Sequence, residues 1–305
     1  MGASGQDFCY GRSTGSEAGR IQPYKNVMCW ELSASSDWMT KYALLKSRRK
    51  TENLKKRYSM SITKEGYMIT TLIFAGGAGK RMNSRSKPKQ FLEMHGKPII
   101  IYTLEYFEYH DEIDNIVVVC IADWIEELKG LLKRFGITKV VKIVPGGETG
   151  HDSIYKGLLA MKDMILNNDI VLIHDGVRPL ISKELISLNI DAVKKYGNAI
   201  TVEAVRESIV CSEDGERIAD VPPRSQMYTA KAPQSFFYSD ILDLYIKAEK
   251  DGIKTVDSSH LCSLYHVPMR MVNSTKNNIK ITEPADFYIY RALYEALEGQ
   301  QVFGI

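Results

Sequence analysis

Short β-branched runs alternate with amphipathic stretches along the chain from Met68 onward. This alternation is typical of parallel strands that are joined by crossover helices. Strands are expected at five apolar runs, Ile69–Ala75, Asn115–Ile121, Lys139–Val144, Asp169–His174 and Asn198–Ala204. Helices are expected at four amphipathic stretches, Ile99–His110, Asp123–Phe135, Asp152–Leu166 and Ser182–Tyr196. The pattern predicts an α/β fold with a doubly wound, mostly parallel sheet.

The pattern changes between Ala204 and Phe236. Two short runs, Ser208–Cys211 and Arg217–Val221, flank the turn sequence at 213–216, which predicts an antiparallel hairpin. Such an insertion is either a dimerisation arm or an ordinary excursion at the edge of the sheet. Further along the chain, the pattern predicts two more helices and a short strand, at Tyr238–Lys250, Pro284–Leu297 and near Met269–Asn273.

The composition fits a soluble globular protein, because 44% of the 305 residues are apolar and 25% are charged. No apolar run approaches the roughly 18 residues that span a bilayer, so no membrane partner is expected. The five cysteines are odd in number and include no Cys-x-x-Cys pair, which argues against a disulfide framework or a zinc site. A cytoplasmic location is the simplest expectation.

The basic charge of the chain is concentrated at its front. Residues 1–67 hold 12 Lys and Arg against 6 Asp and Glu, whereas residues 68–305 hold 28 against 31. A basic N-terminal segment of this kind has three possible functions: a nucleic-acid-binding arm, a transit peptide or a lipidated terminus. The domain's negative charge argues against nucleic acid, the six acidic residues weaken a transit peptide, and Gln6 stands where myristoylation needs Ser or Thr.

We therefore expect residues 1–67 to be a basic leader that is disordered or artefactual, with the natural start at Met60 or Met68. Residues 68–305 are expected to form the domain, with its arm at about 205–230.

The strongest chemical signal is the stretch Leu72–Met82, which is followed by a second basic segment at Lys87–Leu92. A glycine-rich turn after a strand offers backbone N–H groups and fixed cations to a polyphosphate. A Walker A loop would need Gly at position 74 and Ser or Thr at position 81, where Phe74 and Arg81 stand. A dinucleotide fingerprint would need Gly or Ala where Met82 stands. The loop alone predicts a nucleotide site of unidentified kind, or else a plain structural turn.

Later segments also follow predicted strands, where α/β proteins bind ligands. The segment Pro145–Ser153 has three glycines before a predicted helix, which suits a base and ribose or simply a flexible turn with an N-cap. At His174–Pro179, Asp175 is well placed for Mg²⁺ and Arg178 for a second phosphate, the alternative being an Asp-Gly turn with a structural arginine. His174 is expected to be a packed histidine and not a base. One candidate metal-binding Asp with many cations suits phosphoryl or nucleotidyl transfer.

Taken together, six segments resemble the family of alditol-phosphate cytidylyltransferases, which includes the methylerythritol-phosphate and ribitol-5-phosphate enzymes. They are Ala75–Met82, Pro88–Gln90, Gly146–Ser153, His174–Pro179, Ala232–Phe236 and Asn278–Thr282. The resemblance covers the chain from about Met68 to about Tyr294. Lys89–Leu92 and Ile218–Tyr228 resemble the ribitol-phosphate branch, whereas Arg206 resembles the other branch. Gly150 and Lys231-Ala232 depart from the family's usual Arg and Gln-Thr.

The resemblance implies a Rossmann-like, GT-A-like nucleotidyltransferase with a β-hairpin dimerisation arm. It implies that the protein joins CTP and D-ribitol 5-phosphate into CDP-ribitol and pyrophosphate by in-line attack on the α-phosphate, with Mg²⁺, for a cell-wall or capsule polysaccharide. The alternative acceptor is 2-C-methyl-D-erythritol 4-phosphate of isoprenoid synthesis. The alternative from another class is a noncatalytic nucleotide-binding protein.

The resemblance also assigns site residues. The catalytic residues would be Arg81, Lys89, Arg224 and Lys280. The CTP-binding residues would be Phe74, Ala75, Gly76, Gly77, Gly79, Gly147, Glu148, Asp152, Ser153 and Asp175, with the metal on Asp175. The acceptor-binding residues would be Arg178, Arg224, Asp257 and Lys280. The enzyme would be a homodimer in which the arm carries Arg224 toward the partner's site.

Overall fold

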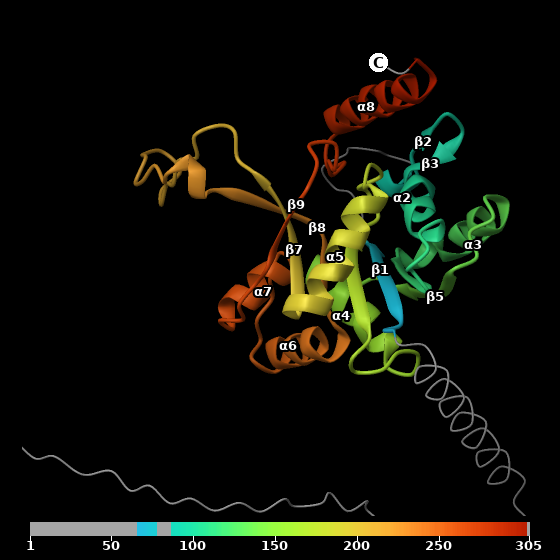
Figure 1. The fold of residues 1–305 in the computed structure, drawn as a ribbon, viewed down its shortest axis with the longest axis horizontal. Coiled ribbons are helices and arrows are strands. Elements are labelled where there is room, and N and C mark those ends of the chain that lie inside the picture. Colours follow the sequence, from blue (N-terminus) through green and yellow to red (C-terminus); the bar gives the residue numbers. More distant parts are fainter. Residues whose placement is uncertain (1–65, 78–86, 304–305) are drawn as a thin grey trace, which may run out of the picture. The chain divides into compact units, whose positions relative to one another are not determined.

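A computed structural model of the protein describes residues 66–77 and 87–303. The predicted leader therefore lies outside the described residues, apart from its last two. The centre of the fold is a seven-stranded sheet with the order β5-β4-β1-β6-β8-β7-β9 (Figure 1). Its strands are β1 Ile69–Ala75, β4 Asn115–Cys120, β5 Val140–Pro145, β6 Ile170–Asp175, β7 Asn198–Ala204, β8 Tyr228–Phe237 and β9 Met271–Asn273. All neighbours are parallel except for β8, which runs antiparallel to both β6 and β7. The predicted mostly parallel sheet is confirmed.

Helices cover both faces of the sheet. The longer helices are α2 Ile99–Glu108, α3 Ile125–Arg134, α4 Gly150–Met161, α5 Lys183–Tyr196, α6 Tyr238–Lys250, α7 Ser258–Leu264 and α8 Pro284–Phe303. Short elements complete the described chain: the strand pair β2 Glu93–Met94 and β3 Lys97–Pro98, and the 3₁₀ turns Lys89–Phe91, Ala122–Trp124 and Arg224–Gln226.

Strand β4 shows why each face of the sheet carries an apolar core. Ile116, Val118 and Cys120 belong to the core that includes buried residues of α2, α3 and α5. Val117 and Val119 point to the opposite face and belong to the core of α4, α6 and α7. Successive side chains of a strand alternate between faces, so a central strand covered on both sides must be apolar throughout.

Helix α4 begins at Gly150, two residues before the predicted start, because a capping box fixes its end. The Thr149 hydroxyl accepts a hydrogen bond from the backbone N–H of Asp152, and the Asp152 carboxylate accepts one from the N–H of Thr149. These bonds satisfy two backbone donors that a helix leaves without partners. The helix thus starts beside the predicted base-binding turn.

Two elements at the site, β8 and α7, were not predicted from the sequence. Strand β8 contains Pro233, and proline normally argues against a central strand because it has no N–H to donate. Helix α7 spans only seven residues, too few for a periodic apolar pattern to show. Both elements line the pocket described below.

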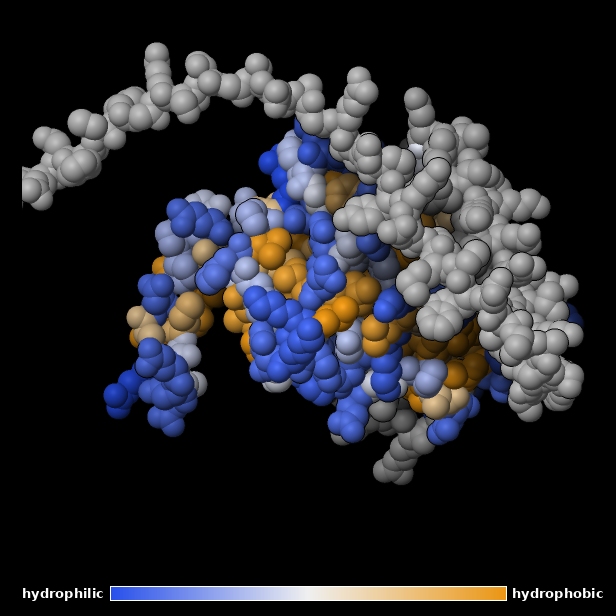
Figure 2. All heavy atoms as spheres, turned by 90° about the horizontal axis from the view of Figure 1, so that it is seen from below, coloured by the Kyte–Doolittle hydropathy of each residue, from blue (hydrophilic) through white to orange (hydrophobic). Residues whose placement is uncertain are grey.

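The predicted antiparallel pairing is present as a single bridge, and not as two strands, in the arm between β7 and β8, and this arm projects from the end of the sheet (Figure 1). It is closed by an antiparallel bridge in which Cys211 N–H donates to the Asp220 carbonyl at 2.8 Å and Ala219 N–H donates back to the Cys211 carbonyl at 2.7 Å. At its tip, Asp214 accepts hydrogen bonds from two successive backbone N–H groups at 2.8 Å. Apolar and polar residues share the surface of this arm (Figure 2).

Candidate active site

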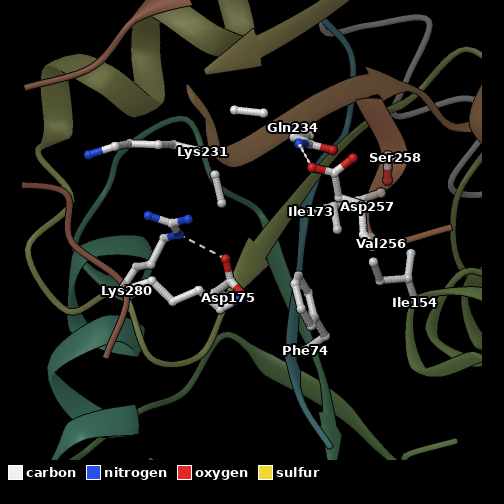
Figure 3. Close-up of a pocket in the computed structure, with 13 residues that line it drawn as sticks. Phe74, Ile154, Ile173, Asp175, Lys231, Gln234, Val256, Asp257, Ser258 and Lys280 are labelled. Atoms are coloured by element: carbon white, nitrogen blue, oxygen red, sulfur yellow. Dashed lines mark hydrogen bonds and ion pairs between the residues drawn. The ribbon is translucent and has the colours of Figure 1, made fainter. Parts of the chain in front are cut away.

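A pocket of about 240 Å³ lies where β1 and β6 end at the carboxyl edge of the sheet. Phe74 of β1, Asp175 of β6 and Gln234 of β8 line it, together with Asp257 before α7 and Lys280 before α8 (Figure 3). Parallel strands bring their carboxyl ends to one edge, so residues that are far apart in sequence meet there.

Asp175 forms ion pairs with two cations on one side of the pocket, Lys280 and Arg178. Lys280 Nζ lies 2.5 Å from its Oδ1, and Arg178 Nε lies 2.8 Å from its Oδ2. Burial by itself raises the pKa of Asp175, but the charges of Lys280 and Arg178 outweigh burial and hold that pKa well below its usual range. The carboxylate is therefore ionised at neutral pH and fixes two cations in place.

The Asn278 main chain connects Arg178 to Lys231 of strand β8. Its carbonyl oxygen accepts hydrogen bonds from Arg178 Nη1 at 3.0 Å and from Lys231 Nζ at 3.2 Å. The Asn278 side chain is fully buried, and its Nδ2 donates to the Ala232 carbonyl at 2.7 Å. Lys231 also forms an ion pair with Glu203 of the neighbouring strand β7. The acceptor-binding segment predicted at Asn278–Thr282 is thus packed against β8.

The two glycine-rich turns predicted to bind CTP touch each other. A Cβ added to Gly76 would lie 2.9 Å from Ser153 Oγ, and one added to Gly146 would lie 2.9 Å from Gly76 Cα. A Cβ at Gly147 would lie only 2.3 Å from Asp152 Cβ. The N–H of Gly147 donates to Ser153 Oγ at 3.0 Å. Glycine is needed here because the two backbones approach more closely than side chains would permit.

Lys89 and Gln90 form hydrogen bonds with two distant parts of the chain, the glycine turn after β1 and the segment Asn278–Thr282. Gln90 is buried, and its Nε2 donates to the Ala75 carbonyl at 2.6 Å and to the Gly77 carbonyl at 3.4 Å. Lys89 Nζ donates to the Ile281 carbonyl at 2.9 Å. Sequence reasoning included Gln90 in a motif but gave it no role, and the structure shows that it holds the glycine loop.

Asp257 forms the other side of the pocket. Its Oδ1 accepts hydrogen bonds from His260 N–H and Ser259 Oγ, each at 2.8 Å, and so caps α7. Its Oδ2 accepts one from Gln234 Nε2 at 3.2 Å. A carboxylate and an amide beside each other offer an acceptor and a donor to neighbouring hydroxyl groups. Gln234 had no predicted role, and its signal was the motif at Ala232–Phe236.

The structure brings together many of the predicted site residues. Phe74, Asp175, Arg178, Asp257 and Lys280 line the pocket. Ala75, Gly76, Gly77, Gly147 and Ser153 form the two touching turns and the strand end beside them.

Other predicted residues lie elsewhere. Glu148 is exposed, and Asp152 caps α4 and pairs with Lys254 at 2.9 Å, so their contacts with CTP stay predictions. Arg224 lies in the exposed arm, where its Nη1 donates to the Arg206 carbonyl at 3.0 Å, and it is not among the pocket-lining residues. Gly79 and Arg81 lie outside the described residues.

His174 is buried, as predicted for a packed histidine. Its Nε2 lies 3.3 Å from the Arg178 carbonyl oxygen, and burial lowers its pKa to about 4. Neutral His174 therefore supports the loop that carries Arg178.

The described residues hold neither a protein-only metal site nor a membrane-spanning helix. Within residues 66–77 and 87–303, no three His, Cys, Asp or Glu side chains are grouped as a protein-only metal site would require. Over the same ranges, no helix has the length and apolar character needed to cross a membrane.

Comparison with known proteins agrees with this geometry. Residues 69–295 match the family described as 2-C-methyl-D-erythritol 4-phosphate cytidylyltransferase. A ribitol-5-phosphate cytidylyltransferase of Streptococcus agalactiae is 48% identical over 77% of this chain and 98% of its own length. A 2-C-methyl-D-erythritol 4-phosphate cytidylyltransferase of Clostridium botulinum is 37% identical over 75% of this chain and 98% of its own. The crystal structure of 4-diphosphocytidyl-2C-methyl-D-erythritol synthase from Anaerococcus prevotii has 28% identity and a TM-score of 0.67, and the match covers 76% and 97% of the two chains.

Proposed function

The chain belongs to the family of alditol-phosphate cytidylyltransferases, and we propose that it joins CTP to D-ribitol 5-phosphate, giving CDP-ribitol and pyrophosphate. The observation that carries the proposal is the pocket in which ionised Asp175 fixes Lys280 and Arg178 beside the two glycine turns. The acceptor is chosen on similarity, because the ribitol-5-phosphate relative is 48% identical and the methylerythritol-phosphate relative 37%.

The residues suit a transfer that depends on positioning and charge. An oxygen of the acceptor's phosphate attacks the α-phosphorus of CTP, and pyrophosphate leaves from the opposite side. Lys280 and Arg178 hold the acceptor phosphate, and the glycine turns with Lys89 hold the triphosphate, because backbone N–H groups and cations stabilise its growing charge. Arg81 joins this group on the strength of the resemblance. No covalent enzyme intermediate is needed.

The proposed Mg²⁺ would bind at Asp175. Mg²⁺ is commonly held by one or two carboxylates together with substrate phosphates, so a single carboxylate fits it once the triphosphate supplies further oxygens. Each Asp175 oxygen already contacts one cation, yet a carboxylate oxygen can accept more than one partner. When bound, the metal would neutralise phosphate charge.

We also propose a homodimer formed through the arm. Val210, Ile218 and Val221 on the arm are each more than half exposed, which is unusual for three aliphatic side chains on one small element. A second copy of the chain would cover them, and the same contact would bring Arg224 toward the partner's acceptor.

The three described cysteines, Cys120, Cys211 and Cys262, are free thiols, which agrees with the proposed cytoplasmic location. Cys120 and Cys262 are buried free thiols, and burial raises the pKa of each to about 11. Such thiols react slowly and need no oxidising compartment.

A pyrophosphate-release assay with CTP and each of the two acceptor phosphates tests the proposal. We expect kcat/KM for D-ribitol 5-phosphate to exceed that for 2-C-methyl-D-erythritol 4-phosphate by about 100-fold or more. The reverse preference would favour the methylerythritol branch. CTP binding without turnover of either acceptor would favour a noncatalytic nucleotide-binding protein.

A further inference from the structure

Lys231 of β8 lines the pocket but belongs to none of the groups placed in the reaction above. Its side chain is only 12% exposed, which is low for a lysine. A buried ammonium is costly unless its donors are satisfied, so the contacts that Lys231 makes show how the fold uses it.

Two fixed partners orient the Lys231 ammonium. Glu203 of β7 supplies the carboxylate of an ion pair, and the Asn278 carbonyl accepts a hydrogen bond at 3.2 Å. An ammonium has three donors, so these partners leave a third N–H for a molecule in the pocket. Because two of the three directions are fixed, the third is fixed as well, and a ligand there need not order a flexible side chain.

Lys231 also meets another cation. Arg178 Nη1 donates to the same Asn278 carbonyl oxygen at 3.0 Å, so two positive groups converge on one atom. Lys280, two residues after Asn278, adds a third cation to this side. The three cations contact two carboxylates, Asp175 and Glu203, so the cluster keeps a net positive charge. An anion that bridges these cations would relieve their mutual repulsion.

We propose that Lys231 is a further ligand of the acceptor's phosphate group, acting together with Arg178 and Lys280. The inference rests on the proposed transfer reaction. It orients the acceptor: the phosphate lies on the side of Lys231 and Lys280, and the hydroxyl groups lie toward Gln234 and Asp257 across the pocket (Figure 3). The site therefore recognises a polyol that carries a phosphate monoester at its end.

The test is steady-state kinetics of Lys231→Gln with CTP and D-ribitol 5-phosphate. Gln retains hydrogen-bonding atoms but removes the charge. We expect KM for the acceptor to rise about tenfold or more, with KM for CTP changed by less than about twofold. Lys250→Gln, on the exposed end of α6, is the matched control and should leave both constants unchanged.

Glu203→Gln separates ligand binding from a structural ion pair. This variant keeps a side-chain oxygen that can accept a hydrogen bond from Lys231 and removes only the negative charge, so a phosphate ligand predicts an acceptor KM that is unchanged or lower. If both variants raise both KM values and lower the melting temperature together, the pair is structural and the inference is overturned. An acceptor KM in Lys231→Gln within about twofold of wild type also overturns it. Failure of the proposed function would show separately, as a wild-type enzyme that does not use D-ribitol 5-phosphate.

Discussion

Lys89 Nζ donates a hydrogen bond to the carbonyl oxygen of Ile281 at 2.9 Å, although 192 residues separate the two in the chain. Gln90, the next residue, holds the carbonyls of the glycine turn, and Lys280, beside Ile281, contacts Asp175. One short bond therefore links the triphosphate side of the site to its acceptor side. The two substrates are positioned by connected backbone segments.

Replacing Lys89 with alanine is expected to lower kcat about 100- to 1,000-fold, because a charge that stabilises the transition state is removed. The protein should still fold, since this side chain is only partly buried. Lys87→Ala is the matched control in the same segment, because Lys87 is exposed and pairs with Glu93 on the surface. Pyrophosphate release measures both variants. Equal activity of Lys89→Ala and wild type would remove Lys89 from the catalytic residues.

Gly147→Ala is expected to destabilise the protein by about 1 to 3 kcal/mol and to raise KM for CTP, because its Cβ would lie 2.3 Å from Asp152 Cβ. Gly150→Ala, three residues away, should be tolerated, since a Cβ there meets no atom within 4 Å. Chemical denaturation and CTP titration check both. Similar losses in the two variants would show that the contact with Asp152 is not the cause.

Arg224 is predicted to act in the partner's site, because it lies in the exposed arm and does not line the pocket of its own chain. Arg224→Ala and Lys89→Ala should each be nearly inactive alone. After denaturation and joint refolding, random pairing should restore about a quarter of wild-type activity, since half of the dimers would carry one intact site. No recovery from dimers shown to have mixed would assign Arg224 to its own subunit.

His174 predicts how stability depends on pH. Burial lowers its folded pKa to about 4, so the unfolded chain binds a proton first as the pH falls below the ordinary value near 6.5. The contribution of neutral, buried His174 to the free energy of unfolding is therefore complete above about pH 6.5, and it is lost as the pH falls toward 4. We expect proton binding by His174 in the unfolded chain to lower the free energy of unfolding by about 2 kcal/mol between pH 7 and pH 5. Urea unfolding of wild type and His174→Gln measures this loss.

Burial also lowers the pKa of His151, so the wild-type slope contains both histidines, and the difference between the two proteins isolates His174. Identical slopes would show that His174 is not buried as a neutral group.

Local patterns predicted most of the fold. The ends of β1 and β7 match the predicted runs, because apolar β-branched residues bounded by turn residues form central strands wherever both faces are covered. Strand β8 could not be predicted in the same way, since Pro233 contradicts its local preference and only pairing with β6 and β7 makes it a strand. Lys231 and Gln234 lie on that strand, and this is why they were missed.

The α/β class, the glycine turns, the candidate cations and the family could all be predicted from residue type and spacing along the chain. Which of these residues meet could not be predicted in this way, because it depends on the three-dimensional fold. Lys280 reaches Asp175, and Lys231 and Arg178 converge on the Asn278 carbonyl, because strand order and helix packing place the segments side by side. Charged groups that are far apart in sequence interact strongly only when the fold brings them within a few ångströms of each other. The pairing within the pocket therefore follows from the fold.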